Sequence, residues 1–239
     1  WIDDKESVLV PLNIWKRNAT TFPDMKGRTV YVGIDLSKKI DLTAVSFIFP
    51  DVDKFLVRVH CFIPSSTLAE KEHTDRVPYR LWKEQGHLTV TPGEIIDYNY
   101  IQAYINRTVA ENNWKVQEIC YDPWSATQFA LEMELDGFTI VEVPQNLKRM
   151  TEPTKAFRDM TYEGKLLHED NPLLNWCVGN AIAKIDHNEN IMLDKAKSTN
   201  RIDPVVATVI GLTRALSHDL ESAQGNRVNN HFSVQNYSF

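Results

Sequence analysis

The chain has 239 residues, of which 43% are hydrophobic and 24% are charged, a composition typical of one large or two small globular domains. No apolar run approaches the roughly 18 residues that a membrane-spanning helix needs, and the first residues lack the apolar core of a signal peptide. The formal net charge of −6 does not indicate nucleic-acid binding, although a local basic face would still allow it.

The cysteines, Cys61, Cys120 and Cys177, are widely spaced and form no CxxC pair, which argues against a zinc ribbon or a thioredoxin-type site. Cys61 and Cys120 lie in apolar runs, where we expect them to pack as small hydrophobic side chains. Three cysteines without regular spacing are typical of a reducing cytoplasm. Because the chain does not begin with Met, we expect a fragment or a processed product.

Residues 1–27 are rich in Pro, Asn, Thr and Gly, and we expect an irregular linker with Trp15 docked on the body of the protein. β-Branched and aromatic residues then predict three strands, at about 28–35, 43–49 and 55–63. The turn residues between the last two strands indicate an antiparallel meander.

Helices and strands alternate over the rest of the chain. Helical spacing and capping residues predict helices at about 66–72, 79–85, 98–112, 123–136, 148–163, 172–180 and 203–220. Further strands are predicted at 116–121 and 139–143, with a hairpin over 182–193. This order predicts an α/β domain over residues 28–220 with a mixed β-sheet flanked by helices, followed by a mobile polar tail at 221–239.

Four aspartates stand where strands are predicted to end or helices to begin. Asp35 ends the first predicted strand, Asp122 follows the strand at 116–121, and Asp203 precedes an apolar helix. Asp122 and Asp203 are each followed by proline, so capping of a helix N-terminus is an alternative role for both. A turn is the alternative role for Asp35 and for Asp41, which lies six residues beyond Asp35.

Carboxylates that converge at one edge of a sheet are suited to divalent metal ions. Two ions roughly 3.5–4 Å apart activate a water and stabilise the departing oxygen during phosphodiester hydrolysis. Mg²⁺ and Mn²⁺ prefer carboxylate oxygen and water, and the seven histidines are scattered without an HxxxH pair. These four aspartates are therefore candidate ligands of such a two-metal site, with the capping and turn roles left open at this point.

Basic residues near these acids are candidates for contacts with DNA phosphates, which would be salt-dependent and largely independent of sequence. The candidates are Lys38 and Lys39 beside Asp35, Lys148 and Lys155 in a predicted helix, and Lys195, Lys197 and Arg201 before Asp203. Solvated loop lysines are the alternative reading of the last group. Trp124 is a further candidate for DNA contact, although packing of its helix against the sheet is the favoured role.

Six segments carry a resemblance to a known family. They are Tyr31-Val-Gly-Ile-Asp-Leu-Ser37 with Asp41-Leu-Thr-Ala-Val45, Ile95-Ile-Asp-Tyr98, Tyr121-Asp-Pro-Trp-Ser-Ala-Thr-Gln128, Pro153-Thr-Lys155, Glu163-Gly-Lys-Leu166 and Lys197-Ser-Thr-Asn-Arg-Ile-Asp203. In this order, across roughly residues 28–218, the chain resembles the C-terminal nuclease domain of the large terminase subunit of tailed bacteriophages.

The resemblance implies a ribonuclease-H-like fold and metal-dependent cleavage of double-stranded, concatemeric viral DNA during genome packaging. It implies Asp35, Asp122 and Asp203 as ligands of two Mg²⁺ or Mn²⁺ ions, with Asp41 as an auxiliary acid. It also implies an N-terminal ATPase domain in the full-length protein, to which residues 1–27 would be the remaining connection. The chain contains no GxxxxGK[ST] loop, so we expect it to hydrolyse DNA but not ATP.

The implied partners are the small terminase subunit and the portal, in the cytoplasm of the host bacterium. Two alternative functions stay open from the sequence. One is a junction-resolvase-like nuclease of the same fold that uses the same acids. The other is a docking module for the portal or the small subunit with weak cleavage, which the polar tail at 221–239 favours.

Overall fold

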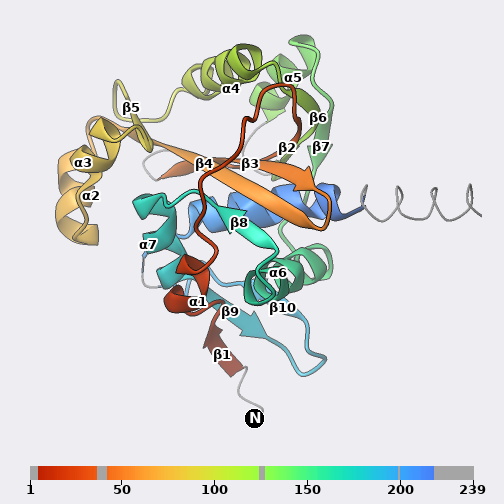
Figure 1. Cartoon of the computed structure of the whole chain (residues 1–239). Coiled ribbons are helices and arrows are strands. Elements are labelled where there is room, and N and C mark those ends of the chain that lie inside the picture. The colour runs from red at the N-terminus through yellow and green to blue at the C-terminus, as the bar shows by residue number, and fades with distance from the viewer. Residues whose placement is uncertain (1–4, 37–41, 124–126, 199, 218–239) are drawn as a thin grey trace, which may run out of the picture.

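The computed structural model describes residues 5–36, 42–123, 127–198 and 200–217 (Figure 1). Its centre is a seven-stranded mixed β-sheet with the order β5-β4-β3-β2-β6-β7, to which β8 adds by pairing with β4. The predicted α/β class with a mixed sheet flanked by helices is therefore confirmed.

The middle of the sheet is the predicted antiparallel meander, formed by β2 (Thr29–Asp35), β3 (Thr43–Asp51) and β4 (Lys54–Pro64). The other strands pair in parallel. They are β6 (Lys115–Tyr121) on β2, β7 (Ile140–Glu142) on β6, and both β5 (Leu88–Thr91) and β8 (Leu166–His168) on β4. The sequence pattern did not predict β5 or β8, because strands this short depend on pairing with β4 rather than on their own residues.

Helices cover both faces of the sheet. They are α2 (Leu68–Asp75), α3 (Tyr79–Glu84), α4 (Tyr98–Asn112), α5 (Thr127–Leu135), α6 (Leu147–Tyr162), α7 (Pro172–Asn180) and a last helix whose described part covers residues 203–217. Figure 1 shows α4 and α5 above the sheet, with α6, α7 and the last helix, in blue, below it. Within the described residues, no helix combines the length and apolar character needed to cross a membrane.

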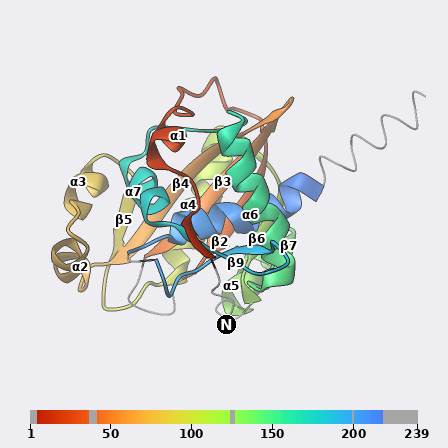
Figure 2. The ribbon, with the colours of Figure 1, turned by 90° about the horizontal axis from the view of Figure 1, so that it is seen from below.

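Alternate residues of β2 face two separate hydrophobic cores, as the pleat of a strand requires. Val30, Val32 and Ile34 pack in the core shared with α4 and α5. Tyr31 packs in the other core, with the last helix, α6 and α7 (Figure 2). Gly33 and Asp35 share this second face because they follow Tyr31 in steps of two residues.

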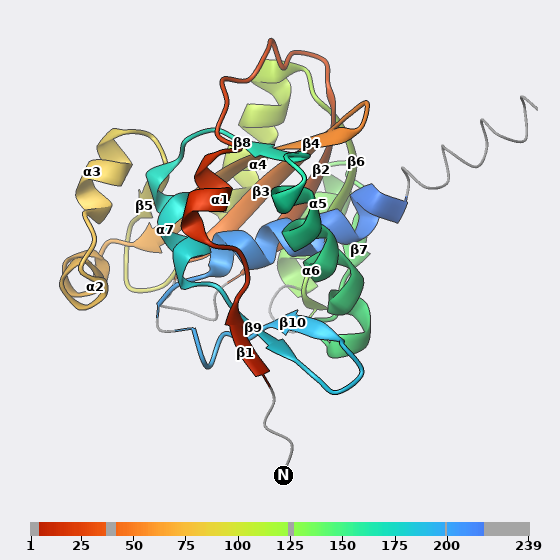
Figure 3. The same ribbon diagram turned by 60° about the horizontal axis from the view of Figure 1, so that its bottom comes forward.

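The prediction of an irregular segment over residues 1–27 is wrong for part of that range. β1 (Lys5–Val8) pairs antiparallel with β9 (Ile182–Ile185), which pairs in turn with β10 (Ile191–Leu193), and α1 (Leu12–Lys16) follows. Figure 3 shows this small sheet beside α6. β1 is four residues long and α1 is five residues long, and both are held by partners distant in sequence. No local pattern therefore marks either element.

The predicted docking of Trp15 is confirmed. Its side chain is fully buried, its ring stacks on His168 at a centroid distance of 3.9 Å, and its Nε1 donates to Asn175 Oδ1 at 2.8 Å. Because α1 is anchored in this way, the segment before β2 is part of the folded body. A connection to a further domain through residues 1–27 stays a prediction.

Candidate functional site

Asp35 and Asp122 lie at the carboxyl ends of two neighbouring strands. β2 and β6 are parallel, with Ile34 opposite Tyr121, and the two aspartates are the next residue in each strand direction. Carboxyl ends of parallel strands are the usual location of ligand sites in α/β sheets. The described part of helix α5 covers Thr127–Leu135, and the role of Asp122 as a helix cap stays an alternative.

Asp203 is brought to the same edge by the last helix. A Cβ built on Gly33 would lie 1.9 Å from the Ala207 carbonyl oxygen, so strand and helix touch through their backbones. Asp203 lies four residues, about one helical turn, before Ala207, and it is the first residue of the helix. Asp35 lies two residues beyond Gly33 on the same face of β2, which places the two carboxylates near each other.

Lys195 joins these two carboxylates. Its Nζ donates to Asp35 Oδ2 at 2.5 Å and lies 3.5 Å from Asp203 Oδ1. The Asp35 and Asp203 side chains are only 4% and 14% exposed, whereas that of Lys195 is 45% exposed. Burial lowers the pKa of Lys195, but the two carboxylates outweigh this effect and raise it. A buried acidic pair is thus covered from the solvent side by one ammonium group.

The backbone that carries Lys195 is fixed. The residue follows β10 in a turn where Asp194 Oδ1 accepts from the backbone N–H groups of Ala196 and Lys197, at 3.0 and 3.2 Å. The Ser198 hydroxyl donates to the Asp194 carbonyl oxygen at 2.8 Å. The β9–β10 hairpin therefore presents a lysine side chain to the edge of the main sheet.

Arg201, a predicted phosphate contact, is bound within the protein in this structure. Its Nε donates to Asp75 Oδ2 at 3.2 Å, and the Tyr79 hydroxyl donates to the same oxygen at 2.8 Å. The Arg201 carbonyl oxygen accepts from Asn180 Nδ2 at 3.4 Å. These contacts attach the segment that precedes Asp203 to α2, α3 and α7. No local signal in the sequence marks Asp75, because its partner Arg201 lies 126 residues away.

The other predicted basic residues are spread around the site. Lys148 on α6 and Lys197 are exposed, whereas Lys155 is half-buried and lies 3.7 Å from Glu152 in an ion pair. Four predicted residues lie outside the part of the chain that the structure describes: Lys38, Lys39, Asp41 and Trp124.

The donor set fits a hard divalent cation better than a soft one. The side chains at this edge offer carboxylate oxygens, and the buried thiols of Cys61 and Cys177 have pKa values raised by burial, with the charge of Asp203 adding to the shift. Both thiols are therefore protonated and unsuited as ligands. Among the described residues, no three His, Cys, Asp or Glu side chains are close enough together to hold a metal.

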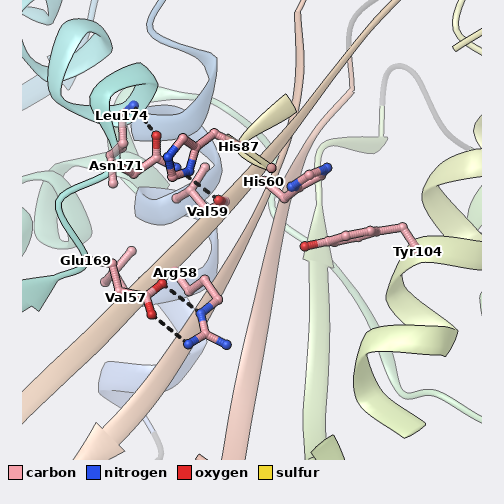
Figure 4. Close-up of a pocket in the computed structure, with 10 residues that line it drawn as sticks. Val57, Arg58, Val59, His60, His87, Tyr104, Glu169, Asn171 and Leu174 are labelled. Atoms are coloured by element: carbon pink, nitrogen blue, oxygen red, sulfur yellow. Dashed lines mark hydrogen bonds and ion pairs between the residues drawn. The ribbon is translucent and has the colours of Figure 1, made fainter. Parts of the chain in front are cut away.

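A separate cavity of about 110 Å³ lies beside β4, away from these aspartates (Figure 4). Arg58 donates to both carboxylate oxygens of Glu169 at 2.8 and 2.7 Å, and His60 stacks on Tyr104 at a centroid distance of 4.2 Å. Burial, followed by the charges of His87 and Arg107, lowers the pKa of His60 to about 4. Arg58 and Glu169 satisfy each other, and this cavity carries no functional assignment.

Comparison with known proteins identifies one family. The model described as terminase large subunit, endonuclease domain, matches residues 1–219. The large terminase subunit of Enterobacteria phage HK97 is 33% identical over 192 residues, which are 79% of this chain and 38% of that protein. The chain spans between 36% and 48% of the length of the curated relatives it matches.

Solved structures agree with this result. The crystal structure of the HK97 large terminase has a TM-score of 0.81 and 29% identity, and it covers 88% of this chain and 44% of that one. The large terminase nuclease of thermophilic phage G20c, solved with bound magnesium, has a TM-score of 0.52 at 11% identity, over 82% of this chain and 84% of that one. At such low identity the second likeness supports the fold alone. The resemblance inferred from the sequence motifs and the ribonuclease-H-like fold are both confirmed.

Proposed function

We propose a function from one premise: this chain belongs to the terminase large subunit, endonuclease-domain family. The proposed function is divalent-metal-dependent cleavage of double-stranded, concatemeric viral DNA during genome packaging. The observation that carries it is the pairing of Asp35 and Asp203 around one ammonium group, with Asp122 at the end of the adjacent parallel strand. Asp35 and Asp203 come from distant segments, and their placement beside one ammonium group serves metal binding better than it serves stability, because bringing like charges together away from water is costly.

Asp35, Asp122 and Asp203 would hold two Mg²⁺ or Mn²⁺ ions, and Asp41 is proposed as an auxiliary acid. When bound, such ions lower the pKa of an attacking water and stabilise the leaving oxygen of the scissile phosphodiester. Nuclease domains of this fold from phage G20c were solved with magnesium and with cobalt, which supports an oxygen-ligated divalent site here. The rigid strand ends of β2 and β6 would keep their two carboxylates aligned without reorganisation during the reaction.

DNA would approach this edge through backbone contacts. Lys148 and Lys197 are exposed and are proposed to contact phosphates, together with Lys38 and Lys39. Lys155 and Lys195 are proposed to contribute when they exchange their present carboxylate partners for phosphate. Arg201, by contrast, is proposed to position the segment before Asp203, because its guanidinium is bound to Asp75.

The wider setting is also a proposal. The HK97 relative is longer than this chain, and a full-length protein would add an ATPase domain that drives packaging. The small terminase subunit and the portal are the proposed protein partners, and the host bacterial cytoplasm is the proposed location.

Cleavage of a supercoiled plasmid tests the proposal. With Mg²⁺ or Mn²⁺, the wild-type chain should nick and linearise the plasmid, and EDTA should stop the reaction. Asp35→Asn, Asp122→Asn and Asp203→Asn should each reduce the rate at least about a hundredfold, since a lost metal ligand removes several kcal/mol of transition-state stabilisation. Asp136→Asn is the matched control, because Asp136 is an exposed surface carboxylate.

Full activity in any of the three folded variants would contradict the assignment. Strong preference for branched over linear DNA would instead support a junction-resolvase-like enzyme. A folded protein without metal-dependent nicking would support a docking module.

A further inference from the structure

Lys195 occupies the place between two carboxylates that the proposed function assigns to metal. Its ammonium lies 2.5 Å from Asp35 Oδ2 and 3.5 Å from Asp203 Oδ1. Mg²⁺ ligands lie about 2.0–2.1 Å from the ion. An ion held by these same two oxygens would therefore overlap the ammonium group, and the two cations exclude each other.

The burial of the acids explains why a cation is present at all. The Asp35 side chain is 4% exposed and that of Asp203 is 14% exposed. A carboxylate this far from water needs a partner of opposite charge, because the loss of hydration is otherwise uncompensated. Lys195 supplies that charge from within the chain.

The position of Lys195 also allows its ammonium group to move away from the two carboxylates. Its side chain is 45% exposed, so the ammonium reaches the acids from the solvent side. The contacts of Asp194 with Ala196 and Lys197 fix only the backbone of the turn. Since the four-carbon stem is flexible, the ammonium can move into water without any change in the fold.

We propose that Lys195 is a displaceable internal counter-ion, which neutralises Asp35 and Asp203 until the first divalent ion replaces it. The inference rests on the proposed function, because it takes these aspartates as metal ligands. A divalent ion prevails because it carries twice the charge of the ammonium and coordinates carboxylate oxygen directly. Metal binding then includes the energetic cost of breaking the lysine contacts.

Mn²⁺ binding tests this competition without any cleavage assay. Free Mn²⁺ would be followed by its electron paramagnetic resonance signal during titration of the wild-type chain and of Lys195→Met. The variant should bind Mn²⁺ about tenfold more tightly, because no ammonium has to be displaced. Lys115→Met is the control: it removes the same charge from an exposed lysine at the start of β6, the end of that strand opposite Asp122, and should change the affinity less than about twofold.

Thermal unfolding gives a second prediction for the same proteins. Without metal, Lys195→Met should melt at a lower temperature than the wild type, because the buried Asp35 and the half-buried Asp203 lose their contact with the ammonium group. Mn²⁺ should raise its melting temperature more than that of the wild type. Equal or weaker Mn²⁺ binding by a folded Lys195→Met would overturn the inference.

A measurement on the wild type covers the case in which the variant does not fold. The rate at which an amine reagent modifies Lys195 would be measured by mass spectrometry, with and without Mn²⁺, with the exposed Lys115 as internal reference. Mn²⁺ should accelerate modification of Lys195, and an unchanged or slower rate would overturn the inference.

If Asp35→Asn abolishes Mn²⁺ binding while Lys195→Met leaves it unchanged, only this inference fails. If the wild type binds no Mn²⁺, the proposed function fails with it.

Discussion

Gly33 of β2 and Ala207 of the last helix are in direct backbone contact, with no space for a side chain between them. A Cβ on Gly33 would lie 1.9 Å from the Ala207 carbonyl oxygen and 2.6 Å from the Gly211 nitrogen. Nearby, the hydroxyls of Ser46 and Thr208 are 2.9 Å apart in a hydrogen bond between β3 and the helix. This close approach sets the distance between Asp35 and Asp203, since one follows Gly33 and the other precedes Ala207.

Gly33→Ala should therefore damage both stability and the site. We expect a loss of about 3 kcal/mol in the free energy of unfolding, because the added methyl group forces the helix away from the strand. Metal-dependent cleavage should fall as well, since the two carboxylates separate. Urea unfolding and plasmid cleavage measure the two effects.

Gly179→Ala is the control for this substitution. Gly179 lies in α7, and its added Cβ would meet Leu12 Cδ2 at 3.9 Å, an ordinary contact. Alanine should be neutral or stabilise by about 0.5–1 kcal/mol through helix propensity. If Gly33→Ala were as stable as Gly179→Ala, the close backbone contact would be refuted.

A second contact, between Glu118 and Arg214, ties the last helix to β6. Arg214 Nε and Nη2 donate to the two carboxylate oxygens of Glu118 at 2.6 and 2.9 Å, and the Glu118 side chain is 9% exposed. Arg214→Met should cost about 3–5 kcal/mol, because it leaves a buried carboxylate without its charged partner. Glu118→Leu with Arg214→Met should be less destabilising than Arg214→Met alone. A double-mutant cycle by urea unfolding checks this order, and additive losses would contradict it.

Trp15 tests whether the segment before β2 is part of the folded body. Trp15→Ala should destabilise the chain by about 3–5 kcal/mol, since it removes a fully buried ring together with its stacking on His168 and its hydrogen bond to Asn175. Trp15→Phe keeps an aromatic ring and should cost less. Thermal or urea unfolding would measure both variants. Unchanged stability in Trp15→Ala would mean that this segment acts as a linker after all.

His60 should make the fold sensitive to acid. Its pKa is lowered from 6.5 to about 4 in the folded chain, mainly by burial. Between these values the unfolded chain binds a proton that the folded chain does not, so stability falls as the pH falls from about 6.5 to about 4. The full loss is on the order of 3 kcal/mol, and it is absent above pH 7.

His60→Gln removes this titration while keeping a polar partner for Thr89, whose hydroxyl oxygen lies 2.7 Å from His60 Nε2. In this range, the slope of the unfolding free energy against pH should decrease by an amount that corresponds to the binding of up to about one proton. Above pH 7, where no loss is expected, the wild type and His60→Gln should have the same slope, which serves as the control. Equal slopes in the two proteins between pH 4 and 6.5 would contradict the assignment.

Local patterns determined much of the fold. The helix at about 98–112 was predicted from its apolar spacing, a local signal, and α4 covers Tyr98–Asn112 with Asp97 as its observed N-cap. The three strands of the meander were predicted because their residues strongly favour buried strands. The motifs around Asp35, Asp122 and Asp203 were sufficient for the family.

Tertiary structure alone decided the rest. β1, α1, β5 and β8 are too short to be marked by their own residues and exist through pairing or packing with distant partners. The sequence offered Lys195 as a phosphate contact, yet the fold places its ammonium on Asp35, 160 residues away. Such contacts depend on how strand and helix pack at Gly33, and packing is a property of the folded chain rather than of any local segment.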